Sequence, residues 1–222
     1  MGYFKNLVRD NRPFFIPFLL FQIVGICLVV LLDKYEIHLF LNDYHTPFLD
    51  KLFIGISELG GTAPLFVCAA VFFFRVRLGC YMSVLQLAAN AITALVKPLF
   101  HIDRPKLLFE QLNLPLYTID TLQIHAHNSF PSGHTTAAFA LFFALCLAVK
   151  NKTLKLICFF LALLTGFSRI YLAQHFLEDV LAGSAVALFV GLLLYRWFDD
   201  SHSWGNRSVQ YYVRQCSKKA GV

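Results

Sequence analysis

The stretch Phe14–Leu32 reads FFIPFLLFQIVGICLVVLL, 19 residues without a charged side chain. A helix of about 20 mostly apolar residues crosses the hydrocarbon core of a bilayer. The run is too long for the apolar part of a signal peptide, and no small-residue cleavage site follows it at Asp33-Lys34-Tyr35. It therefore predicts a membrane-spanning helix.

Five more apolar runs follow along the chain, at Thr62–Phe74, Leu78–Val96, Gly133–Val149, Leu154–Phe167 and Val180–Phe198. The chain is 58% hydrophobic and 14% charged, whereas a soluble domain is about 45–50% apolar and about 25% charged. This composition excludes disorder and argues against a water-soluble globule. The sequence predicts an all-α bundle of six transmembrane helices, one integral-membrane domain over residues 1–222.

The basic residues orient this bundle, because cytoplasmic loops collect Lys and Arg. With six spans, the side that holds both termini carries 13 of the 19 basic residues and the other side carries 6. Both termini are therefore predicted to be cytoplasmic. The net charge of +6 follows from this bias and requires no nucleic-acid partner.

The longer segments outside the spans are 33–61 and 97–132 on the outer side and the polar tail 199–222 on the inner side. In the first, Phe48, Leu49, Leu52, Phe53 and Ile56 follow the spacing of one helical face. Two interpretations stay open: an amphipathic helix at the outer interface, or a cap packed on the bundle. The tail is expected to be loosely ordered. Five of the six cysteines lie within spans, so we expect no disulfide.

Polar residues gather at the outer ends of the spans, where charged groups are costly and usually functional. Three segments contribute: Lys97 to Arg104-Pro105, Pro131-Ser132-Gly133-His134, and Ser168-Arg169 with His175 and Asp179. The topology that follows from loop charge alone brings all three segments to one face.

Together these groups are suited to phosphate chemistry. Lys97, Arg104 and Arg169 are three cations, and the arginine fork matches phosphate oxygens. Ser132 and Gly133 begin a helix whose free N–H groups bind anions. The four-residue spacing of His175 and Asp179 puts both on one helical face.

A carboxylate there can hold one nitrogen of the His175 imidazole and leave the other free to attack. His134 is a second imidazole, available as a general acid. No carboxylate cluster suited to Mg²⁺ is present, so the expected reaction is metal-independent hydrolysis of a phosphate ester or anhydride, without a cofactor.

The three segments resemble the signature of the type 2 phosphatidic acid phosphatase superfamily, K-x6-RP, PSGH and SR-x5-H-x3-D, with every fixed position matched. They span residues 97–179. The resemblance implies an all-helical bundle in which His175 is the nucleophile that forms a phosphohistidine, Asp179 orients it and His134 donates the leaving-group proton. It also implies phosphate binding, by Lys97, Arg104, Ser132, Gly133 and Arg169.

With six spans, the resemblance favours the integral-membrane lipid phosphatase branch. It implies a phosphorylated membrane lipid as the substrate, with its phosphate at the outer face, which is the periplasmic face of a bacterial inner membrane. Candidate substrates are undecaprenyl pyrophosphate, lipid A phosphate and phosphatidylglycerol phosphate. The alternatives are a phosphotransferase that uses the same pocket, a non-catalytic lipid-binding relative and an anion transporter.

Other polar residues have weaker functional interpretations. His101, Asp103 and Lys106 have two possible roles: they contact the lipid headgroup, or they are solvated residues of a surface loop. His125 and His127 form an H-x-H pair that could bind a metal, but no acidic partner is evident. Polar residues within the third span are expected to hold helices together; they are Gln86, Asn90 and Thr93.

Overall fold

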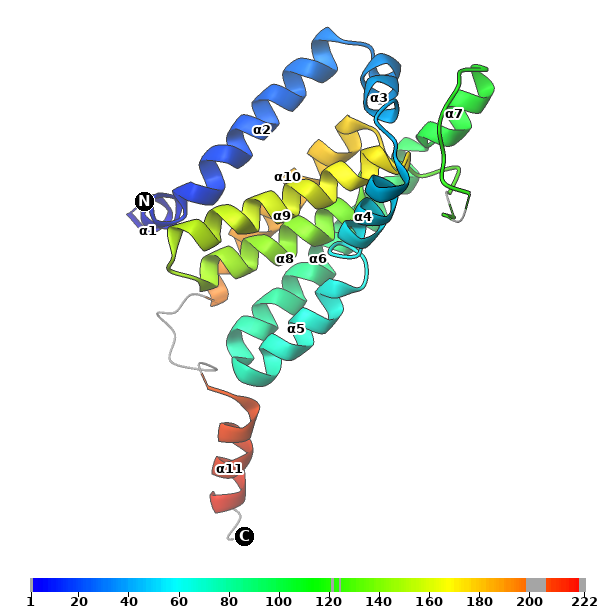
Figure 1. The fold of residues 1–222 in the computed structure, drawn as a ribbon. Helices are drawn as coiled ribbons and strands as arrows, with labels where there is room; N and C mark the ends of the chain where they lie inside the picture. Colours follow the sequence, from blue (N-terminus) through cyan, green and yellow to red (C-terminus); the bar gives the residue numbers. More distant parts are fainter. Residues whose placement is uncertain (1, 121, 124, 199–206, 220–222) are drawn as a thin grey trace.

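The computed structural model describes residues 2–120, 122–123, 125–198 and 207–219, and all regular secondary structure in these ranges is helical (Figure 1). The helices are α1 (Gly2–Asp10), α2 (Arg12–Leu31), α3 (Lys34–Asn42), α4 (Pro47–Ser57), α5 (Ala63–Phe74), α6 (Val76–Phe100), α7 (Pro105–Gln111), α8 (Gly133–Ala148), α9 (Lys152–Tyr171), α10 (Leu177–Phe198) and α11 (Val209–Lys219).

Each of the six predicted apolar runs forms a helix, namely α2, α5, α6, α8, α9 and α10. Four of them, α2, α6, α9 and α10, are long and apolar enough to cross a membrane. The other two are shorter, with 12 residues in α5 and 16 in α8. The all-helical membrane fold is therefore confirmed, and the count of six spans stays a prediction.

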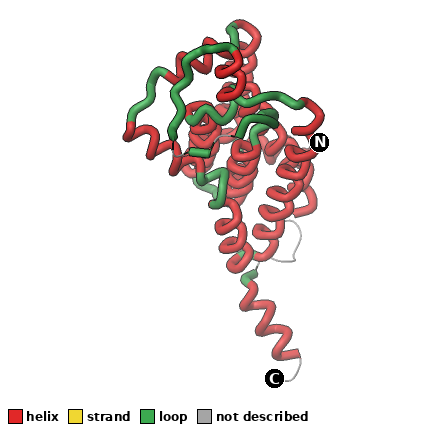
Figure 2. Tube along the Cα trace, turned by 90° about the vertical axis from the view of Figure 1, so that its right-hand side faces the viewer, coloured by secondary structure: helices red, strands yellow, loops and turns green. Residues whose placement is uncertain are grey.

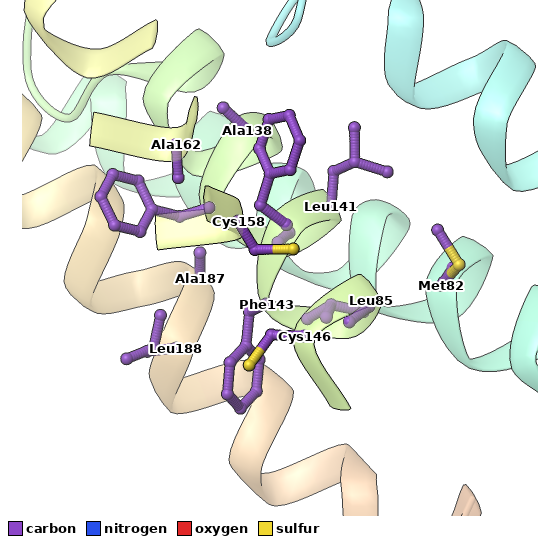
Figure 3. Close-up of a cluster of buried hydrophobic side chains, with 14 of the residues drawn as sticks. Met82, Leu85, Ala138, Leu141, Phe143, Cys146, Cys158, Ala162, Ala187 and Leu188 are labelled. Carbon is purple, nitrogen blue, oxygen red and sulfur yellow. The ribbon is translucent and has the colours of Figure 1, made fainter. Parts of the chain in front are cut away.

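Helix α8 lies at the centre of the bundle and packs against α6, α9 and α10. Its Ala and Phe side chains are almost all buried, because small residues let neighbouring helices approach while the rings fill the remaining space. Figure 3 shows part of this core, including Cys146 and Cys158. The Nε2 atom of Gln86 donates to the carbonyl of Ala137 over 2.8 Å, so it joins α6 to α8 as expected.

Helix α2 packs on α9 and α10, but only 11% of its apolar stretch is buried inside the protein. Figure 1 shows that it diverges from those two helices toward α3. Phe14, near its start, is fully buried among aromatic rings of α8 and α9. The outward apolar face of α2 is typical of a helix in contact with lipid.

Helices α3, α4 and α7 and the α9–α10 turn lie at one end of the bundle, and α1 with the α5–α6 and α8–α9 turns lies at the other (Figure 1). Figure 2 shows most of the loops gathered at the first end, away from α11. We call this first end the outer end.

Segment 33–61 forms two helices where one was predicted. The side chain of Asp33 caps α3 and that of Thr46 caps α4. Phe53 of α4 is buried against Tyr171 and Leu172, so α4 forms a cap on the bundle, although Phe48 is 73% exposed.

Two further features differ from the sequence analysis. Helix α7 was not predicted, and the expectation of a loosely ordered tail is wrong for Val209–Lys219, which form α11. The rest of that expectation concerns residues 199–206 and 220–222, outside the described residues.

Candidate active site

A cavity of about 350 Å³ lies at the outer end of the bundle. Its walls come from α4, α6, α8, α9 and the loops that follow α7 and α9. Six of the eight predicted site residues line it: Lys97, Arg104, Gly133, His134, Arg169 and His175. The other two, Ser132 and Asp179, are fully buried beside it at the starts of α8 and α10.

The first turn of α8 is open toward this cavity. Ser132 is the N-cap, and its hydroxyl accepts hydrogen bonds from the backbone N–H and the side chain of Thr135. No atom lies within 4 Å of the position that a Cβ on Gly133 would take. The open turn therefore presents backbone N–H groups and the positive end of the helix dipole to any anion in the cavity.

His175 and Asp179 form a buried pair, with exposed fractions of 2% and 0%. The Nδ1 atom of His175 lies 3.3 Å from Oδ2 of Asp179. The same oxygen accepts hydrogen bonds from the hydroxyl of Ser129 and the backbone N–H of Phe176. Since Nδ1 is occupied by the carboxylate, Nε2 is the nitrogen available to the cavity.

The position of His175 keeps its imidazole neutral. Burial lowers its pKa well below the usual 6.5, and the positive charges of Arg104, Arg169 and Lys97 lower it further. A neutral imidazole at physiological pH is the nucleophilic form.

The three cations are held by oxygen acceptors that carry no full charge. Arg104 donates to the backbone and the side chain of Gln174, and Lys97 donates to the carbonyl of Asn128 over 3.3 Å. Arg169 donates to the hydroxyl of Ser57, and its Nε atom has no hydrogen-bond partner among the described residues. Their positive charges therefore remain available to an anion.

The structure places the remaining candidate residues in different surroundings. His125 lines the cavity, whereas the exposed His127 contacts Asp103 over 2.6 Å. His101 ends α6 in a left-handed conformation with φ 48°. Among the described residues no group of three His, Cys, Asp or Glu side chains could hold a metal ion.

Sequence reasoning missed five polar residues around the cavity: Ser57, Glu58, Gln123, Ser129 and Gln174. Ser57 and Glu58 come just before Gly60-Gly61, at the end of an apolar helical face. A polar pair at this position was the sequence feature that could have indicated a place near the site. Ser129 lies directly before the Phe130-Pro131 pair, and no sequence pattern shows that it reaches Asp179.

Sequence reasoning also missed a polar cluster that holds the cap in place. Asp50 of α4 accepts hydrogen bonds from Tyr171 and Tyr117 and contacts His45. Burial alone would raise the pKa of Asp50, but these three partners outweigh burial and hold the pKa below 3.8. The cluster ties α4 to α9 and to the loop after α7.

Comparison with known proteins gives one consistent result. A family model described as the PAP2 superfamily matches residues 78–203. The chain is 31% identical to the undecaprenyl-diphosphatase BcrC of Bacillus subtilis, over 79% of this chain and 90% of that one. It is 28% identical to phosphatidylglycerophosphatase B of the same organism, over 69% and 77% of the two chains. The crystal structure of Aquifex aeolicus LpxE is similar with a TM-score of 0.64 and 27% identity, over 72% of this chain and 93% of that one.

Proposed function

The chain belongs to the PAP2 superfamily and is a membrane phosphatase, and we propose that it hydrolyses a lipid phosphate or pyrophosphate through a phosphohistidine on His175. The observation that carries the proposal is the outer-end cavity, in which three cations and two imidazoles meet at the open first turn of α8. Such a site suits a tetrahedral oxyanion.

In the first step, Nε2 of His175 attacks phosphorus while Lys97, Arg104, Arg169 and the first N–H groups of α8 hold the phosphate oxygens. The bond from phosphorus to the lipid oxygen breaks, and that oxygen takes the proton of His134. Asp179 stabilises the positive charge that forms on the imidazole of His175.

In the second step, water attacks the phosphohistidine. His134, now neutral, accepts a proton from this water, and the bond between nitrogen and phosphorus breaks to release phosphate and neutral His175. With a lipid pyrophosphate, the first leaving group is the lipid monophosphate. A hydroxyl-bearing acceptor in place of water would make the same site a phosphotransferase.

A second cavity supports a lipid substrate. It has a volume of about 530 Å³ and lies between α2, α3, α9 and α10, with apolar residues such as Phe21, Phe40 and Phe167 in its walls. It also includes Ile170 and Val180, which are adjacent in sequence to Arg169 and Asp179. A prenyl or acyl chain in this cavity would leave its phosphate near the outer end of the bundle.

Undecaprenyl pyrophosphate is the first substrate to test, because the undecaprenyl-diphosphatase relative matches over most of both chains. The assay is phosphate release by purified protein in detergent from this lipid, lipid A phosphate and phosphatidylglycerol phosphate, with His175→Ala as the control. We expect one lipid to be hydrolysed fastest by the wild type and none by the variant. Phosphate release from none of the three by the wild type would refute the proposal.

We also propose that the outer end faces the periplasm and that both termini are cytoplasmic, since basic residues are in excess on the side of the termini. A reporter enzyme that is active only in the periplasm should be inactive when fused to the C-terminus. Activity of that fusion would overturn the orientation.

A further inference from the structure

Among the described residues that line the outer-end cavity, Glu58 is the one acidic side chain. It lies in the turn after α4, and the family signature quoted above contains no such residue. A carboxylate in a cavity suited to phosphate repels the substrate. Its presence there calls for a function that outweighs this repulsion.

The structure places the Glu58 carboxylate next to His134. A Cβ on Gly61 would lie 3.0 Å from Oε2 of Glu58 and 3.4 Å from Nε2 of His134. The carboxylate oxygen and the imidazole nitrogen therefore both lie close to this Cβ position, at most 6.4 Å from each other. A Cβ on Gly60 would lie 2.2 Å from the carbonyl oxygen of His134, so this turn packs directly on the first turn of α8.

The carboxylate is held in this place by its own turn. The hydroxyl of Thr62 donates to Oε2 of Glu58 over 2.9 Å, and the backbone N–H of Thr62 approaches the same oxygen at 3.4 Å. The residue before Glu58, Ser57, accepts a hydrogen bond from Arg169. The turn that carries Glu58 is therefore tied to Arg169.

The charges around His134 explain why an acidic neighbour matters. Burial opposes a positive charge on His134 most strongly, the charges of Arg169 and Arg104 add to this, and the carboxylate of Glu58 favours the positive charge. A general acid must carry its proton when the leaving group departs. Glu58 is the neighbouring charge that counteracts this tendency of His134 to lose its proton.

We propose that Glu58 is a positioning residue that favours the protonated form of His134, whose proton is transferred to the leaving lipid oxygen. Glu58 keeps its own charge throughout; the proton moves from His134 to the lipid oxygen and returns from the attacking water. This inference rests on the proposed function, because it assigns a residue to the acid step of that reaction.

The test compares two leaving groups. An alkyl phosphate needs a proton on its departing oxygen, whereas p-nitrophenyl phosphate releases a stable phenolate. For Glu58→Gln we expect kcat on a medium-chain alkyl phosphate to fall about 10- to 100-fold and kcat on p-nitrophenyl phosphate to fall less than about 3-fold. KM should not rise, because a negative charge is removed from an anion site. Glu110→Gln, an exposed carboxylate on α7, is the matched control and should behave as the wild type.

A second pair of variants tests the same contact without removing a charge. Gly61→Ala places a methyl group against both side chains, at a backbone position outside the left-handed region, and Gly55→Ala adds one where no described atom lies within 4 Å. We expect Gly61→Ala to reproduce the leaving-group dependence and Gly55→Ala to leave it unchanged. Equal losses on both phosphates, or no loss in Glu58→Gln, would overturn the inference while the wild type stays active. A wild type inactive on both phosphates would instead refute the proposed function.

Discussion

The substitution Asp179→Asn tests the charge behind the nucleophile with almost no change in shape. Oδ2 of Asp179 accepts from Ser129 and from the backbone N–H of Phe176. The backbone N–H of Phe176 can only donate, so it requires an oxygen at the position of Oδ2. The oxygen of the new amide therefore takes the position of Oδ2, and its nitrogen takes the position of Oδ1, which has no hydrogen-bond partner among the described residues. His175 therefore retains the same tautomer; the negative charge is lost, and an amide N–H₂ group takes the place of Oδ1.

The expected loss follows from that geometry. A hydrogen bond to a charged group is worth about 1.5–3 kcal/mol and a neutral one about 0.5–1.5 kcal/mol. The difference of about 1–2 kcal/mol corresponds to a fall in kcat of about 5- to 30-fold. Asp179→Ala should cost more, because it leaves the donors of Ser129 and Phe176 without an acceptor.

The assay is steady-state phosphate release from a short-chain lipid phosphate, with Glu178→Gln as the control at the adjacent carboxylate. We expect Glu178→Gln to keep its activity, since Oε2 of Glu178 has no hydrogen-bond partner among the described residues, and Nδ1 of His175 contacts Asp179 and Ser129 instead. An Asp179→Asn variant as active as the wild type, or as inactive as Asp179→Ala, would refute the reasoning.

Three other predictions follow from the structure. Because the pKa of His175 lies well below 6.5, kcat/KM, corrected for ionisation of the substrate phosphate, should persist as the pH falls below 6.5; loss of half the activity at pH 6.5 or above would contradict this. The pKa of Asp50 is held below 3.8 in the folded protein, so the ionised carboxylate stabilises the fold above pH 3.8, and this stabilisation is lost as the pH falls below that value. Asp50→Asn should therefore lower Tm by about 5 °C at pH 7 and by less at pH 3. An equal Tm of variant and wild type at pH 7 would count against this prediction. Phe14→Ala should cost about 3–5 kcal/mol of stability in thermal unfolding, because Phe14 is fully buried; an unchanged Tm would show that this packing contributes little.

Much of the bundle could be predicted from the sequence because bilayer length and apolar runs are directly linked. The ends of α2, α5 and α10 agree closely with their predicted runs. The prediction was weaker for segment 33–61, since the apolar face of α4 suits both lipid and protein, and only tertiary contacts of Phe53 distinguish the two. Helix α7 has only seven residues, which is too short for a periodic signal.

The same contrast holds for the candidate site. His134, His175 and the three cations could be proposed because charged groups at span ends are rare. Their roles remain predictions, although the structure gathers them around one cavity. Ser129 could not be found in this way, because its loop reaches Asp179 only through long-range contacts. Glu58 ends an apolar helical face, but its place beside His134 likewise depends on long-range packing.

The central claim is that His175 carries the phosphate during the reaction. The most direct measurement is rapid mixing with a radiolabelled aryl phosphate, quenching in base, which preserves phosphohistidine, and mass spectrometry of the digested protein. We predict phosphate on His175 in the wild type, more of it in His134→Ala, which lacks the base that activates water, and none in His175→Ala. Full activity of His175→Ala, or phosphate attached to another residue, would contradict the mechanism.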